Sequence, residues 1–375
     1  MAVVTPWEVK GSIDYDKVIA EFGVSKIDSV LLKRIEKHAK AKGLELHPFL
    51  RRGIFFAHRD LKFILDEYEK GNRFFLYTGR APSGNVHLGH LVPWMFTKWL
   101  QDVFDVELWF QFPDEEKFLF NKKLSYEDTQ KYLHENMLDV IAVGFDPKKT
   151  HFLVDTKHAG VMYPEALKVA RHITFSTVKS AFGFTHDQNI GAIFYTSMQA
   201  VPTFLPSVLA QKNIPCLIPH AIDQDPHFRV SRDVIPKLGY LKPGSIQCRF
   251  LPSLQGMDAD GKMSSSSGDN ATIFSIDDEK TIAKKVNKYA FSGGQATIEE
   301  HRLKGGNPDI DVSYQWLLFF EEDDAVLAQI YNDYKKGILL SGELKKKLIE
   351  KIQGILREHQ KRRAKAHIHI KDFMY

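Results

Sequence analysis

The sequence is poor in cysteine, with Cys216 and Cys248 as the only two among 375 residues. Two cysteines cannot build a disulfide framework, which favours a reducing compartment. The sequence also lacks an apolar run long enough to cross a membrane, and its first residues lack the basic segment and apolar core of a secretory signal. We therefore expect a cytoplasmic protein that does not contact membranes.

The composition is that of a protein with a sizeable core, since 43% of the residues are hydrophobic and 27 are Phe. A chain of this length suits two domains. Strand-like runs stop before about residue 270, and only helical patterns follow. We therefore expect an α/β domain with a parallel sheet over residues 1–272, including an N-terminal extension (1–73), and an all-helical domain over 273–375.

Residues 74–90 combine a strand, a loop and the start of a helix. An apolar, aromatic run ends in a Gly/Pro/Ser/Asn cluster, and an amphipathic segment follows at 91–104. Free backbone N–H groups and the positive end of a helix then meet at one point, which suits a phosphate. His87 and His90 stand there with Gly89 between them. Two alternatives stay open, ordinary surface histidines and a zinc site, although the neighbouring sequence has no cysteine and no clear third ligand.

Polar residues follow two further apolar runs. Residues 106–112 complete a strand–helix–strand unit, which predicts a parallel sheet, and 113–117 come directly after this strand. Residues 216–219 form another strand, followed by a polar cluster in which Asp225 is predicted to cap a helix that starts at Pro226. Because ligands of open α/β sheets bind at the carboxyl ends of the strands, these clusters are predicted to share a site with the first loop.

A second loop, residues 258–268, is rich in small residues and contains Lys262 and four serines from Ser264 on. Taken alone, this composition is typical of a mobile surface loop. A lysine with several hydroxyl donors also suits the negative charge that grows on phosphate oxygens during phosphoryl or nucleotidyl transfer. Both interpretations stay open for the loop alone.

Together the two loops carry a resemblance to a known family. His87-Leu88-Gly89-His90 and Lys262-Met263-Ser264-Ser265-Ser266, in this order, resemble the two signatures of the class I aminoacyl-tRNA synthetases. Other segments resemble first the tryptophanyl/tyrosyl subgroup and then the tryptophanyl-tRNA synthetases of eukaryotic and archaeal type; they cover nearly the whole chain, at 6–7, 51–56, 77–83, 97–104, 221–226, 291–294, 297–301 and 305–307. The resemblance implies a Rossmann-like nucleotide-binding domain and a helical anticodon-binding domain whose last helix packs back on the catalytic domain.

The specificity for tryptophan follows from the same comparison. Similar tyrosyl enzymes have an Asp three residues after the Gln of a Met-Gln element, whereas Gln199 is here followed by Ala-Val-Pro. An indole N–H still needs an acceptor, and the resemblance assigns the role of acceptor to Tyr77 and Gln111. For Gln111, a surface amide at the strand end stays as the alternative. The resemblance assigns the substrate ammonium to Glu116, Gln199 and Gln224. It assigns the substrate carboxylate to Lys117.

The resemblance also implies how ATP is bound. It assigns the ATP phosphates, the adenine and the ribose to Arg80, His87, Gly89, His90, Asp223, Lys262, Met263 and Ser264, and it makes His87, His90, Lys262 and Ser264 the catalytic residues. Mg²⁺ would bridge phosphate oxygens without a metal site built by the protein.

The implied reaction has tryptophan attack ATP, after which the 2′-hydroxyl of the terminal adenosine of tRNA(Trp) attacks the adenylate. A homodimer is implied as well. Between residues 335 and 365 there are eleven Lys/Arg and three Glu, an excess that suits either a solvated helix face or the tRNA backbone. The open alternatives for the activity are a tyrosyl-specific synthetase, a small-molecule adenylyltransferase of the same fold and a non-catalytic interaction module.

Overall fold

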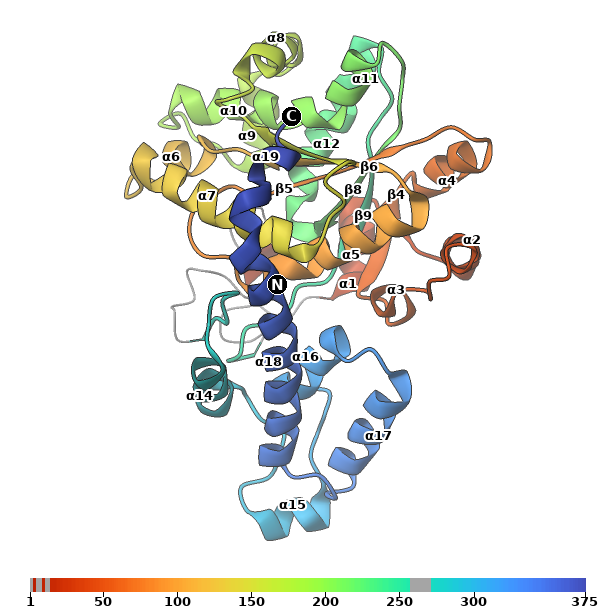
Figure 1. The fold of residues 1–375 in the computed structure, drawn as a ribbon, viewed down its shortest axis with the longest axis vertical. Helices are drawn as coiled ribbons and strands as arrows, with labels where there is room; N and C mark the ends of the chain where they lie inside the picture. The colour runs from red at the N-terminus through yellow and green to blue at the C-terminus, as the bar shows by residue number, and fades with distance from the viewer. Residues whose placement is uncertain (1–2, 5–8, 11–13, 257–270) are drawn as a thin grey trace.

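The computed structural model describes residues 3–4, 9–10, 14–256 and 271–375. Within these ranges a seven-stranded sheet is flanked by helices, and a group of helices follows it along the chain (Figure 1). The strands are β1 (Val3–Val4), β2 (Val9–Lys10), β3 (Ser25–Lys26), β4 (Phe55–Arg59), β5 (Phe75–Gly79), β6 (Glu107–Phe112), β7 (Thr150–Val154), β8 (Cys216–Ala221) and β9 (Gly244–Cys248).

The sheet has the strand order β3-β4-β9-β8-β5-β6-β7, and β1 pairs separately with β2. The five strands from β9 to β7 are parallel, whereas β4 is antiparallel to β9 and β3 to β4. From β5 the chain builds β6 and β7 on one side and then returns to build β8 and β9 on the other. Such a reversal opens a crevice at the carboxyl ends of the central strands. The expected parallel α/β sheet is confirmed.

Helices connect the strands and cover both faces of the sheet (Figure 1). Up to residue 256 they are α1 (Tyr15–Phe22), α2 (Ser29–Ala41), α3 (Pro48–Arg51), α4 (Leu61–Glu69), α5 (Leu88–Phe104), α6 (Glu116–Phe120), α7 (Tyr126–Val143), α8 (Ala159–Ala170), α9 (Phe175–Phe182), α10 (Ile190–Ala200), α11 (Leu205–Leu209) and α12 (Asp225–Val234). From residue 271 on they are α14 (Glu279–Tyr289), α15 (Ile298–Lys304), α16 (Val312–Phe320), α17 (Asp324–Lys335), α18 (Ser341–Ala366) and α19 (Ile370–Phe373). No helix in the described part of the chain is long and apolar enough to cross a membrane.

Two elements differ from the sequence prediction. Helix α5, which follows β5, begins at Leu88, one turn before the predicted start at residue 91, because His87 and His90 form a capping box at its N-terminus. β9 was not predicted: it is short, and two of its five residues, Ser245 and Gln247, are buried polar groups that bond each other at 2.7 Å. Ile246 and Cys248 alternate with these polar residues, but the alternation covers only four residues and contains just two apolar side chains, which is a weak signal for a strand.

Helix α18, the longest helix after residue 271, runs from the helical group to the helices that cover the sheet. Its second half lies along α7 (dark blue beside yellow in Figure 1). There His359 Nε2 is 2.9 Å from Asp139 Oδ1, and Arg363 Nε donates to the same oxygen at 3.1 Å. His359 and Asp139 are both buried, so α18 and α7 share a satisfied polar contact within their interface.

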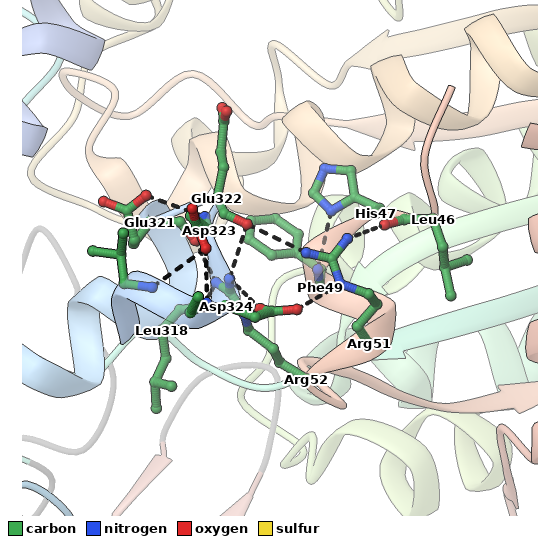
Figure 2. Close-up of polar contacts among 12 residues, drawn as sticks. Leu46, His47, Phe49, Arg51, Arg52, Leu318, Glu321, Glu322, Asp323 and Asp324 are labelled. Carbon is green, nitrogen blue, oxygen red and sulfur yellow. Dashed lines mark hydrogen bonds and ion pairs between the residues drawn. The ribbon is translucent and has the colours of Figure 1, made fainter. Parts of the chain in front are cut away.

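A second contact between the sheet part and the helical group comes from Arg51 and Arg52, the last residue and the C-cap of α3 (Figure 2). Arg52 donates from Nε to Asp324 Oδ1 at 2.7 Å, from Nη1 to the carbonyls of Leu318 at 2.9 Å and Glu321 at 2.5 Å, and from Nη2 to the carbonyl of Glu322 at 3.2 Å. These carbonyls end α16, where a helix leaves its last acceptors unpaired. Arg51 donates to the other oxygen of Asp324 at 2.9 Å. The two arginines therefore cap α16 and bind the first turn of α17.

We expect Arg52→Ala to lower the midpoint of thermal unfolding by several degrees, because it leaves the carbonyls at the end of α16 without their charged donor. Hydrogen bonds to charged groups contribute about 1.5–3 kcal/mol. Arg357→Ala is the control: Arg357 pairs with Glu279 in an exposed ion pair, which contributes little. Equal shifts in both variants would contradict a capping role for Arg52.

Candidate active site

A cavity of about 320 Å³ lies at the carboxyl ends of β5, β6 and β8, a size that suits a small-molecule site. Eleven of the fourteen residues predicted for the site line it: Tyr77, Arg80, His87, Gly89, His90, Gln111, Glu116, Lys117, Gln199, Asp223 and Gln224. The other three, Lys262, Met263 and Ser264, lie outside the described residues.

Tyr77 and Gln111 reach the cavity from neighbouring strands. Side chains of a strand alternate between its faces, and Tyr77 on β5 shares a face with Trp109, two residues before Gln111 on β6. The Tyr77 hydroxyl donates to Gln111 Oε1 at 2.5 Å, and burial raises the pKa of Tyr77 well above its usual value. Gln111 is 1% exposed, so the interpretation of it as a surface amide is wrong.

Charged and polar groups from α6 and α10 also line the cavity. Lys117 Nζ contacts Glu116 Oε1 at 2.6 Å, and the Tyr195 hydroxyl donates to Glu116 Oε2 at 3.4 Å. Gln199 Oε1 is buried and has no hydrogen-bond partner among the described residues. An uncompensated buried acceptor is costly, so this oxygen is suited to a donor that arrives with a ligand.

The two histidines at the start of α5 stack face to face, with ring centroids 3.5 Å apart. The backbone N–H of His87 donates to His90 Nδ1 at 3.2 Å, so a neutral His90 carries its proton on Nε2. The backbone N–H groups of Leu88 and His90 are bonded to the carbonyls of Ile273 and His87. The predicted cradle of free backbone N–H groups is therefore wrong at these three positions, although both histidines line the cavity.

Arg80 follows β5 directly. Its backbone N–H donates to the carbonyl of Gln111 at 2.9 Å. Its side chain is different, because Nε and Nη2 are buried without a partner in the described part of the chain, and burial lowers the pKa of Arg80 to about 10. A buried guanidinium with unused donors is suited to an anion such as phosphate.

The polar cluster after β8 is held from the N-terminal segment. Asp225 is fully buried, and Arg59 donates to its two oxygens at 3.0 and 2.9 Å. The prediction that Asp225 caps the helix is wrong, because Gln224 is the capping residue and Asp225 lies in the first turn of α12. Since Asp223 and Gln224 precede this ion pair directly, Arg59 ties their segment to β4.

The sequence prediction missed two polar groups of this region. Asp155 follows β7 and contacts Gln111, and the strand-end rule used for residues 113–117 would have found it. His220, on β8, lines the cavity. Its Nδ1 lies 2.8 Å from the Ala221 carbonyl and so carries the proton, while Nε2 is buried without a partner among the described residues.

The family model described as tRNA synthetases class I (W and Y) matches residues 69–357, so the chain belongs to the class I aminoacyl-tRNA synthetases of the tryptophan and tyrosine family. Its relatives along nearly the whole chain are tryptophan–tRNA ligases of archaeal and eukaryotic organisms. This confirms the resemblance seen in the sequence.

Three of these proteins illustrate the similarity. The tryptophan–tRNA ligase of Sulfolobus acidocaldarius is 50% identical over 364 residues, which are 97% of this chain and 92% of the relative. The cytoplasmic tryptophan–tRNA ligase of Saccharomyces cerevisiae is 50% identical over 377 residues, covering 96% and 86%. The crystal structure of Plasmodium falciparum tryptophanyl-tRNA synthetase superposes with a TM-score of 0.87 at 44% identity, covering 97% of this chain and 95% of that one.

We expect a pH-dependent stability from Glu115, which lies beside Asp114 and Asp155. Burial raises the pKa of Glu115 to about 7, so the folded chain holds this proton more tightly than the unfolded chain. The contribution is full below the unfolded pKa and is lost as pH rises through about 7. We therefore expect the midpoint of thermal unfolding of the unmodified protein, measured relative to that of Glu115→Gln, to decrease as the pH is raised from about 5 to about 8. A constant difference across this range would contradict the raised pKa.

Proposed function

We propose that this protein activates L-tryptophan with ATP to tryptophanyl-adenylate and transfers the tryptophanyl group to the 2′-hydroxyl of the terminal adenosine of tRNA(Trp). The overall reaction is the aminoacylation of tRNA(Trp) with tryptophan, the reaction that names its relatives. The observation that carries the proposal is the convergence of eleven predicted residues on one cavity at the carboxyl edge of the sheet.

Tyr77 and Gln111 select the indole ring. Indole offers one N–H donor and no acceptor, and the free lone pairs of the Tyr77 and Gln111 oxygens supply acceptors in a dry part of the cavity. A site built around a buried hydrogen bond can reject a ligand that lacks the matching group by roughly 10⁴-fold. This pair therefore provides selection as well as binding.

The polar end of the cavity holds the amino-acid backbone. The substrate ammonium binds Glu116, Gln199 and Gln224, and its carboxylate binds Lys117. In the structure Glu116 and Lys117 pair with each other, so the zwitterion replaces one ion pair by two. Gln199 gains a donor for its buried oxygen, which offsets part of the cost of removing the substrate from water.

ATP binds on the other side of β5. Arg80, His87 and His90 donate to the phosphates, Gly89 allows adenine to approach the start of α5, and Asp223 accepts from the ribose. Lys262, Met263 and Ser264 complete this half on the strength of the sequence signature. Mg²⁺ bound with ATP would neutralise charge on the phosphate oxygens.

In the first step a tryptophan carboxylate oxygen attacks the α-phosphorus, and the bond from this phosphorus to the bridging oxygen of the β-phosphate breaks, releasing pyrophosphate. The side chains align the two reactants and stabilise charge that spreads over the phosphate oxygens. Arg80 and the two histidines act on the phosphates from the sheet side, and Lys262 with Ser264 acts on the leaving pyrophosphate. In the second step the tRNA hydroxyl attacks the carbonyl carbon, and AMP leaves.

The helical region, residues 273–375, binds the tRNA anticodon in this proposal. Its basic excess is smaller in effect than the sequence indicates, because several of the cations bind within the chain: Lys351 pairs with Glu321, Arg357 with Glu279, and Arg363 with Asp139. Lys346 and Lys361 also pair with glutamates of the same helix, and Lys345 donates to the Asn287 carbonyl. Lysines of α18 such as Lys347 and Lys365 are therefore the ones proposed to attract a phosphate backbone.

We also propose a homodimer in the cytoplasm. The adjoining helices α8 and α10 carry exposed apolar side chains, namely Val161, Tyr163, Leu167 and Ile190, which a dimer interface would cover. The location follows the relative from Saccharomyces cerevisiae, which is named as cytoplasmic.

Amino-acid-dependent exchange of pyrophosphate into ATP tests the activity. We expect exchange with tryptophan and, among the twenty amino acids, none of comparable rate with tyrosine. Exchange with tyrosine in place of tryptophan would overturn the specificity, and no exchange with any amino acid would overturn the activity.

A further inference from the structure

We propose that Asp155 is a positioning residue for tryptophan selection, which acts by holding the side-chain amide of Gln111 in one orientation. The proposal rests on the function given above and deepens it. Its basis is a chain of buried hydrogen bonds that begins at the cavity wall with Tyr77, passes through Gln111 and ends at a carboxylate outside the cavity lining.

Gln111 lies between a donor and an acceptor. Its Oε1 accepts from the Tyr77 hydroxyl at 2.5 Å, and its Nε2 donates to Asp155 at 3.0 Å to Oδ1 and 2.8 Å to Oδ2. All three side chains are at most 2% exposed. No other hydrogen bond competes for the amide nitrogen among the described residues, so Asp155 decides which end of the amide faces it.

The orientation of this amide decides what the cavity can recognise. With Nε2 toward Asp155, the second lone pair of Gln111 Oε1 and the lone pairs of the Tyr77 oxygen remain as acceptors for an indole N–H. If the amide rotated by half a turn, two N–H donors would replace the acceptor, and Oε1 would face the oxygens of Asp155. Without Asp155, both orientations become accessible, and the donor-bearing one opposes the indole N–H.

Asp155 keeps an acceptor toward Gln111 in either protonation state. Burial, followed by the charge of Glu115, raises the pKa of Asp155 well above its usual value. Both carboxylate oxygens lie within hydrogen-bond distance of Gln111 Nε2, at 3.0 and 2.8 Å, so one of them remains an acceptor when the other carries a proton. The amide therefore always meets an oxygen lone pair.

A neighbouring aspartate provides a matched control. Asp114 is also fully buried near the ends of β6 and β7, but its oxygens accept from Thr156, Tyr126 and Gln130. None of these contacts includes Gln111. A change at Asp114 therefore disturbs the same region without removing the partner of the amide.

The test measures kcat/KM for pyrophosphate exchange with tryptophan and with benzothienyl-alanine, in which sulfur replaces the indole N–H. We expect Asp155→Ala to lower kcat/KM for tryptophan about tenfold to hundredfold, through KM for tryptophan and with KM for ATP unchanged, because a buried hydrogen bond is lost. Benzothienyl-alanine should lose little, so the ratio of the two substrates shifts toward the analogue. Asp114→Asn should leave this ratio unchanged.

A second variant keeps the test decisive if Asp155→Ala does not fold. Asp155→Asn offers Gln111 one acceptor and one donor, so the ratio should shift in the same direction by a smaller factor. In a Gln111→Met background, where no amide remains to be oriented, neither change should alter the ratio.

An unchanged ratio in the folded Asp155 variants, or an equal shift in Asp114→Asn, would overturn the positioning role. The proposed function fails separately, if the unmodified protein shows no exchange with tryptophan.

Discussion

The parallel pairing of β5 with β6 and with β8 is the constraint on which the site depends. Parallel strands end at one edge, so the segments after these three strands meet although they are distant in the sequence. Gly79 makes the pairing close: a Cβ at this position would lie 2.8 Å from the carbonyl oxygen of Gln111. β5 contributes to both halves of the cavity, with Tyr77 on the tryptophan side and Arg80 on the phosphate side.

The two halves differ in how their polar groups are satisfied. Tyr77, Gln111 and Asp155 form a closed chain of hydrogen bonds, and such buried networks hold one geometry when every member is paired. In the other half, Arg80 keeps buried donors without partners in the described residues. This contrast suits a rigid pocket for the amino acid and an anion site that is completed by its ligand.

Sequence motifs predicted the parallel sheet and the cavity residues that lie in loops directly after strands, because such residues are placed by the strand order alone. Asp155 also follows a strand directly, so the strand-end rule covers its position; its contact with Gln111 is different, because it depends on the register of β6 against β7, where Gln111 pairs with Leu153, and a sequence pattern does not give this register. The backbone cradle at α5 was wrong because the His90 ring takes the His87 N–H, a competition that a pattern does not reveal. The same holds for Asp225, whose cap was replaced by an ion pair with Arg59, far away in the sequence.

The central claim is that one sheet edge holds tryptophan and ATP on opposite sides of β5 with the indole N–H read by Tyr77 and Gln111. A crystal structure with tryptophan and a non-hydrolysable ATP analogue tests it most directly. We expect the indole nitrogen within hydrogen-bond distance of the Tyr77 or Gln111 oxygen, and the analogue's phosphates against Arg80 and the two histidines. An indole ring bound away from Gln111, or phosphates away from the start of α5, would contradict the account.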